Sequence, residues 1–166
     1  MNNCQNFLTP QQTQNNLGDG YLKFQVNKHI SAVLSIKNAQ EVIFLPVESV
    51  TSMPNMPACI LGLINWQNSL IWVIDLAIML NVKVDNKITW QYNIIIIRTD
   101  LGLLGLVVFE IKGTTRFISD RIDSPELEVQ SKLLPYLSGY VRQDKEIIYV
   151  LDAIAIVQSS VLHTNS

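Results

Sequence analysis

The chain has 166 residues, of which 48% are hydrophobic and 16% charged, and its formal net charge at pH 7 is −2. A chain of this length and apolar content can bury one core, or two small linked ones, so the composition favours a folded protein over a disordered one. Because 12 basic residues are balanced by 14 acidic ones, the chain has no cationic surplus to attract phosphate groups, and nucleic acid is not an expected ligand.

The two ends of the chain are polar. Residues 1–19, rich in Asn and Gln, lack the basic start and apolar stretch of a secretory signal, and we expect them to form a disordered tail. Residues 159–166 are expected to form a second tail. The longest uncharged apolar run, 101–109, is far shorter than the roughly 20 residues that span a bilayer, so we expect a cytoplasmic protein without membrane insertion. Cys4 and Cys59 lie far apart, which fits reduced thiols.

Apolar and polar residues alternate in many short segments of the chain. Leu22, Phe24 and Val26, for example, are separated by single polar residues, which is the pattern of a half-buried strand. The same reasoning predicts strands at 21–26, 30–36, 41–45, 63–66, 70–74, 92–98, 103–109, 114–118 and 147–151. Many short strands at such spacing indicate a barrel or a sandwich.

The sequence contains an internal repeat. Shifting the chain by 77 positions, from Gly62 to Gly139, aligns GLINWQNSLIWVID with GYVRQDKEIIYVLD without a gap. Apolar residues at helical spacing follow the aspartate that ends each copy, Asp75 or Asp152, as expected where an aspartate caps a helix. We infer two similar barrel-like halves, each with a glycine, a strand, a polar turn, a strand and a capped helix, and place the changeover between them near 85–90.

Most catalytic signatures are missing from the chain. Its two histidines, His29 and His163, have no cysteine or carboxylate at ligand spacing, so no metal is expected. Asp75 and Asp152 suggest a shared-proton carboxylate pair, but each leads into a helix, so capping is the stronger interpretation. No catalytic residue and no cofactor are predicted.

Two tryptophans and two connecting segments raise structural questions. Trp66 and Trp72 are expected to face the same side of a hairpin; Trp72 is assigned to the core, while Trp66 is left open between the core edge and a contact surface. The Pro-rich segment 45–57 is expected to cross the surface as a rigid arm. Segment 119–137 is expected to be a solvated connector with a short possible helix between its prolines.

Five segments together resemble the CheW-like domain family, across residues 20–158. They are AQEVIFLP (39–46), MPNMPACILGLINW (53–66), IWVIDL (71–76), LGLVV (104–108) and YLSGYVR (136–142). The resemblance implies a mainly β fold: two intertwined five-stranded SH3-like β-barrels with a few short helices. It also implies a non-catalytic adaptor for chemotaxis or motility that couples chemoreceptors to a CheA-type histidine kinase at membrane-associated receptor arrays. The NMPACILGLINW variant is most similar to forms from type IV pilus motility systems.

The family's roles transfer to matching positions of this chain. The first barrel would dock on the regulatory domain of the kinase through Glu41, Val42, Gly62, Trp66, Gln67 and Asn68. A groove between the barrels would take the cytoplasmic tip of a receptor through Gly105, Phe109, Ile111 and Gly139.

Two departures from the family pattern leave other functions open. The family has Arg-Gly where this chain has Gln67 and Asn68, and often an aspartate where it has Phe109. Loss of the arginine suggests an alternative, an interaction module that binds receptor or pilus components without the kinase. A third possibility, a barrel that binds a small ligand or an oligonucleotide, is disfavoured by the charge of the chain.

Overall fold

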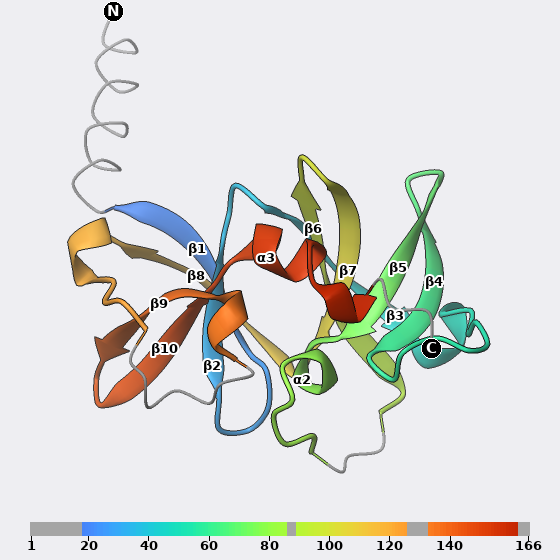
Figure 1. Cartoon of the computed structure of the whole chain (residues 1–166), viewed down its shortest axis with the longest axis horizontal. Coiled ribbons are helices and arrows are strands. Elements are labelled where there is room, and N and C mark those ends of the chain that lie inside the picture. Colours follow the sequence, from blue (N-terminus) through green and yellow to red (C-terminus); the bar gives the residue numbers. More distant parts are fainter. Residues whose placement is uncertain (1–17, 86–88, 126–132, 163–166) are drawn as a thin grey trace, which may run out of the picture.

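The computed structural model describes residues 18–85, 89–125 and 133–162. These residues form two five-stranded sheets that lie side by side in Figure 1. The strand order is β8-β1-β2-β10-β9 in the first sheet and β3-β6-β7-β5-β4 in the second. Each sheet combines antiparallel pairs with one parallel pair, β2 with β10 and β5 with β7. The predicted fold class is confirmed.

The first sheet comprises β1 (Asp19–Gln25), β2 (Ser31–Ser35), β8 (Glu110–Phe117), β9 (Leu137–Gln143) and β10 (Glu146–Leu151). The second comprises β3 (Ala39–Pro46), β4 (Ile60–Trp66), β5 (Ser69–Asp75), β6 (Gln91–Thr99) and β7 (Gly102–Val108). The short helices are α2 (Leu76–Met79), α3 (Ala153–Val157) and the 3-10 turns η1 (Val47–Ser49), η2 (Ser119–Arg121), η3 (Leu134–Tyr136) and η4 (Ser160–Leu162).

The chain changes sheets at two places, and neither is near 85–90 as predicted. It leaves the first sheet after β2, completes the whole second sheet from β3 to β7, and returns at Phe109. In chain order, positions 85–90 fall between β5 and β6, which both belong to the second sheet. The prediction assumed that each half is one continuous stretch of chain. Instead, the first sheet combines the first two strands, β1 and β2, with the last three, β8, β9 and β10.

The borders of the domain also differ from those predicted. Asp19 already belongs to β1, and Ser159 is buried, with its hydroxyl 2.6 Å from the hydroxyl of Tyr136. The remaining tail residues, 1–17 and 163–166, lie outside the described residues, as does 126–132, which is most of the stretch between Pro125 and Pro135 where a short helix was expected.

The sequence repeat is a structural repeat. Hairpin β4–β5 with α2 and hairpin β9–β10 with α3 occupy the same place in the two sheets. In each copy, the aspartate that caps the helix donates its backbone N–H to an upstream carbonyl: Asp75 to Cys59 at 2.7 Å, and Asp152 to Tyr136 at 2.8 Å. The equivalence thus extends beyond the aligned 14-residue segments into the chain that precedes each hairpin.

Three apolar clusters fill the fold. One lies within each sheet, and a larger one between them draws residues from both sheets and from α2 and α3. Strand β6 serves two clusters at once, because Ile94 and Ile96 face the inside of the second sheet while Ile95 and Ile97 face the central cluster. Helix α3, coming from the first sheet, packs against β6 of the second (Figure 1). The two sheets therefore share one core.

Both aspartates cap their helices, which supports the structural interpretation of the repeat. The Asp75 carboxylate accepts a hydrogen bond from the backbone N–H of Ile78 at 3.2 Å. The Asp152 carboxylate accepts hydrogen bonds from Ile154 and Ala155 at 3.0 and 3.2 Å. Burial raises the pKa of the Asp75 carboxyl, and this effect outweighs the opposite effect of the hydrogen bond from Ile78.

We expect Asp152→Ala to lower the free energy of unfolding by about 1 kcal/mol through loss of the cap. Asp75→Ala should cost less, because removing a partly buried charge offsets part of the lost capping. Asp75→Asn is the matched control, since the amide oxygen keeps the acceptor without the charge. Urea denaturation measures all three. Full stability of Asp152→Ala would contradict the capping role.

Candidate interaction surfaces

The two outer strands of the second sheet are joined by a side-chain hydrogen bond. The indole N–H of Trp66 on β4 donates to Oε2 of Glu41 on β3 at 3.1 Å. Trp66 is 7% exposed and packs in the cluster inside the sheet with Ile64 and Ile96. The alternative left open for Trp66 is thereby decided: it is a core residue whose polar end reaches the sheet edge.

Trp66 and Trp72 do not face the same side of their hairpin, so that prediction is wrong. Trp72 packs against the central cluster instead. The reason is the two-residue turn, in which Trp66 pairs directly with Ser69. Paired residues share a face, so Trp66 shares its face with Ile71, and Trp72 points the other way.

The Gln67–Asn68 turn carries an unusual backbone. Both residues have positive φ, 47° and 64°, as two-residue hairpin turns of the favoured twist require. The equivalent turn of the first sheet, Asp144–Lys145, has φ values of 51° and 66°. Gln67 and Asn68 are both exposed, directly after Trp66. This turn is therefore a fixed protrusion on which side chains can be exchanged.

The six residues assigned to kinase binding are only partly grouped. Glu41, Trp66, Gln67 and Asn68 lie at one end of β3 and β4. Val42 packs partly buried against the central cluster, on the opposite face of β3. Gly62 is buried beside Thr51, which bridges to Leu63. A partner at this end would therefore contact the turn directly. Gly62 would affect binding indirectly, by allowing the backbone of Thr51 to pack closely.

The four residues assigned to receptor binding do not line one groove. Gly105 is buried inside the second sheet, where an added Cβ would lie 3.1 Å from Ile94. Gly139 is buried in the first sheet against the backbone of Asp123. Phe109 and Ile111 are partly buried at the seam between the sheets. Of the four, Phe109 and Ile111 are the residues with partly exposed side chains.

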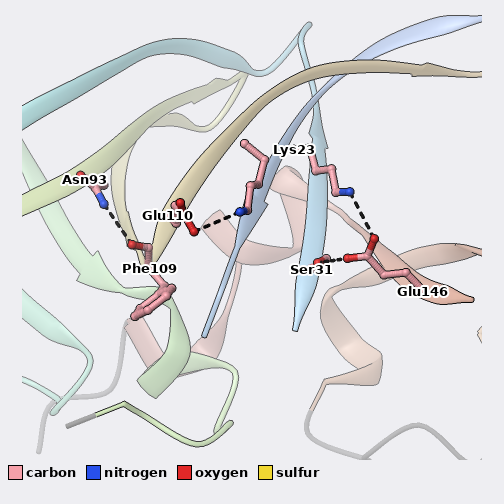
Figure 2. A network of polar contacts seen from close by, with 7 residues as sticks. Lys23, Ser31, Asn93, Phe109, Glu110 and Glu146 are labelled. Atoms are coloured by element: carbon pink, nitrogen blue, oxygen red, sulfur yellow. Dashed lines mark hydrogen bonds and ion pairs between the residues drawn. The ribbon is translucent and has the colours of Figure 1, made fainter. Parts of the chain in front are cut away.

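Phe109 marks the point where the chain returns to the first sheet. Its backbone N–H donates to the carbonyl of Gln25 at 2.9 Å, and its carbonyl accepts from the side-chain amide of Asn93 at 3.0 Å. Figure 2 shows the second of these bonds, with the Phe109 ring directed away from it. The backbone of Phe109 is thus hydrogen-bonded to both sheets, while its ring points away from the bond to Asn93.

A cleft of about 650 Å³ opens beside this seam. It is lined by Val26, Phe44, Asp75, Ala77, Val84, Asp85, Thr89, Trp90, Gln91, Tyr92, Asn93, Val107, Val108 and Phe109. The sequence reasoning missed Phe44 and Trp90, which are 54% and 82% exposed. A signal existed for Trp90, a large aromatic residue outside every predicted strand.

A polar network ties three strands of the first sheet together (Figure 2). Glu146 of β10 accepts a short hydrogen bond from the Ser31 hydroxyl of β2 and lies 3.3 Å from the Lys23 ammonium of β1. The Ser31 bond, followed by the nearby Lys23 charge, holds the pKa of the Glu146 carboxyl below its ordinary value. The ionised form of Glu146 is therefore the one that this fold favours.

We expect Glu146→Gln to remove stability at neutral pH and to matter less in acid. Because the pKa of Glu146 is lower in the folded chain, the unfolded chain binds the proton more readily. The ion thus contributes stability above the ordinary pKa of 4.5, and this contribution is lost as the pH falls through the folded value. Urea denaturation of both proteins at several pH values checks it; a difference that grows in acid would contradict it.

Among the residues that the structure describes, no group of three or more His, Cys, Asp or Glu side chains is arranged to hold a metal ion. Within the same residues, no helix has the length and apolar character to cross a membrane. Cys59 is buried, and burial raises the pKa of its thiol.

Comparison with known proteins identifies the family. The model of the CheW-like domain matches residues 20–161. The chain belongs to the CheW-like domain family. A probable chemotaxis protein CheW from Rhizobium etli is 30% identical over 103 residues, which cover 61% of this chain and 65% of that protein. The alignment thus spans less than two thirds of that relative.

The CheW-like fold is also found among solved structures. The scaffolding protein TtCheW from Thermoanaerobacter tengcongensis superposes with a TM-score of 0.71 at 23% sequence identity. The match covers 82% of this chain and 85% of that one. At this level of identity the comparison establishes a common fold.

Proposed function

We propose that this CheW-like protein is a non-catalytic scaffold of chemotaxis or pilus-motility signalling, which couples chemoreceptors to a CheA-type histidine kinase. The observation that carries the proposal is the CheW-like match across residues 20–161, nearly the whole described domain. The relatives named as a chemotaxis protein and a scaffolding protein support it. We propose that the protein needs no cofactor and acts in the cytoplasm at receptor arrays.

The kinase surface is proposed at the end of β3 and β4. The Glu41–Trp66 bond fixes the two edge strands, and the turn that follows projects Gln67 and Asn68 into solvent. Leu70, just beyond the turn, is 70% exposed and adds apolar area to this surface. Exposed edge strands and an apolar side chain are suited to edge-to-edge docking of another β domain.

The receptor surface is proposed at the seam between the sheets, where Phe109 and Ile111 are accessible in part. The buried Gly105 and Gly139 would then influence receptor binding through packing. Their lack of a side chain lets neighbouring segments approach closely, Ile94 and Val73 at Gly105 and the Asp123 backbone at Gly139. An apolar helix is the partner that such a seam suits.

Capture from cells tests the coupling to the kinase. We expect the tagged protein to retain a CheA-type kinase together with receptors, and Gln67→Arg to retain about tenfold more kinase or better, since an interface arginine can be worth about 2 kcal/mol. Position 67 already holds a long side chain at a positive φ of 47°, so we expect the exchange to leave the fold unchanged. Asp144→Arg, in the equivalent turn of the first sheet, is the matched control.

The same capture separates the two functions considered. Kinase and receptors together support the coupling scaffold. Receptors or pilus components without kinase, unchanged in Gln67→Arg, favour the uncoupled module, which the absence of an arginine in the turn suggests. Equal gains from Gln67→Arg and Asp144→Arg would show a general effect of added charge and count against a kinase surface at this turn.

A further inference from the structure

The cleft beside the seam has an aromatic wall assembled from distant parts of the chain. Phe44 comes from β3, Tyr92 from β6, Trp90 from the residue before β6 and Phe109 from the β7–β8 junction. Phe44 and Trp90, at 54% and 82% exposure, leave large apolar surfaces open to solvent. Aromatic faces carry a negative quadrupole that attracts cations.

The charged side chains among the described residues that line this cleft are all acidic. Asp75 and Asp85 line the cleft, and the described lining residues include no Lys, Arg or His. The ion pairs among the described residues, Lys23–Glu146 and Lys112–Glu110, involve neither aspartate. Asp75 and Asp85 accept hydrogen bonds from backbone N–H groups, of Ile78 and Lys28 respectively, which are donors without net charge. The cleft is therefore a negative site.

The charge of Asp75 acts on the rest of the cleft. Burial raises the pKa of the Asp75 carboxyl, and the hydroxyl of Tyr92 has its pKa raised by burial and then by the charge of Asp75. The partly buried carboxylate of Asp75 therefore lies near the aromatic ring of Tyr92. A bound cation would stabilise the ionised form of this carboxylate, because an opposite charge favours the charged form.

We propose that this cleft binds an arginine side chain of a protein partner. A guanidinium is planar, stacks on aromatic faces and donates hydrogen bonds to carboxylates, so it matches both components of the wall. A partner protein is favoured over a free small cation because the exposed rings of Phe44 and Trp90 at the rim need a larger surface to cover them.

The inference rests on the proposed function in one respect: Phe109 belongs both to this cleft and to the proposed receptor surface. The protein that carries the arginine would therefore be the one docked at the seam. Phe109 stands where the family often has an aspartate, so this chain has an aromatic wall in place of a further charge there. The arginine site is thus a property of this chain's own residues.

A short peptide tests the site without any knowledge of the partner. The probe is an acetylated, amidated alanine pentapeptide with a central arginine, and the control peptide has neutral citrulline in its place. Binding is followed by the NMR shift of the Trp90 indole N–H, with those of the buried Trp66 and partly buried Trp72 as internal references. We expect saturable binding of the arginine peptide, about tenfold or more tighter than citrulline.

Variants locate the binding. Asp75→Asn keeps the capping acceptor and should weaken arginine binding about fivefold or more, as should Phe109→Leu. Asp100→Asn removes an exposed carboxylate outside the cleft and should leave binding unchanged. Equal binding of the two peptides, or full binding by Asp75→Asn and Phe109→Leu, would overturn the proposal.

A basic residue of the chain itself is the competing occupant. Lys87 lies between Asp85 and Thr89 in the sequence, outside the described residues. Unchanged affinity in Lys87→Ala supports a partner's arginine, whereas a rise of about tenfold or more would show that the chain fills its own cleft. Capture of kinase and receptors without peptide binding would contradict the arginine site and leave the proposed function standing. Peptide binding without capture of kinase or receptors would support the arginine site and contradict the proposed function.

Discussion

Gly62→Ala and Gly139→Ala are each expected to lower the free energy of unfolding by about 3 kcal/mol or more, because a side chain cannot be added without moving backbone. A Cβ at Gly62 would lie 2.1 Å from the carbonyl oxygen of Thr51, and one at Gly139 would lie 2.3 Å from that of Asp123. Both glycines let an upstream segment pair with the residue that follows, Thr51 with Leu63 and Asp123 with Tyr140.

A third glycine, Gly113, serves as the control. Gly62 also has a positive φ of 151°, whereas the crowding at Gly139 involves no such backbone. Gly113 has a φ of 111° with nothing within 4 Å of an added Cβ, so Gly113→Ala reports the cost of positive φ alone, about 1–3 kcal/mol. Urea denaturation compares the three. A cost for Gly139→Ala below that of Gly113→Ala would contradict the crowding account.

The glycine variants also bear on the assigned binding roles. Gly62 was assigned to the kinase surface and Gly139 to the receptor surface, yet both are buried against upstream backbone, that of Thr51 and of Asp123 respectively. If they act through the fold, each variant should lose kinase and receptor capture together, in proportion to its lost stability. Selective loss of one partner at full stability would favour a direct contact.

The local elements could be predicted because their causes are local. Alternation located most strands, and the matching Gly and Asp positions revealed the repeat and both helix caps. Strand β9 showed no clean alternation, since Gly139 and Arg142 interrupt it, and was evident only through the repeat. The run Ile94–Ile97 is apolar without a break because β6 is buried on both faces.

What escaped prediction depends on how distant segments pair. The changeover point follows from β1 and β2 joining β8, β9 and β10, which no local pattern records. The opposite orientation of Trp66 and Trp72 follows from the length of the turn between them. The cleft needs β3, β6 and the β7–β8 junction at one place, so its aromatic residues could not be grouped in advance.

Trp66→Ala is expected to lower the free energy of unfolding by about 3–5 kcal/mol, because it empties a large site inside the second sheet. Trp66 is 7% exposed and packs in the cluster with Ile64 and Ile96, while its indole N–H bonds to Glu41. Trp90→Ala is the control for a lost tryptophan: at 82% exposure it should cost no more than about 0.5 kcal/mol. Equal costs in urea denaturation would contradict the core assignment.

A gentler change separates the packing of Trp66 from its hydrogen bond. Trp66→Phe keeps an aromatic ring and removes the donor to Glu41, for an expected cost of about 1 kcal/mol from the bond in addition to a smaller packing loss. Combining it with Glu41→Ala should show a coupling energy of about 1 kcal/mol in a double-mutant cycle. No coupling would mean that the bond does not hold β3 to β4 in solution.

The same variant decides how the edge strands serve the proposed kinase surface. The Glu41–Trp66 bond joins β3 to β4 just before the turn at Gln67. If kinase capture falls in Trp66→Phe while Trp66→Phe remains folded, the bond fixes the geometry that the partner recognises. If capture persists, the exposed turn and Leu70 supply the contact by themselves, because they do not depend on the indole N–H.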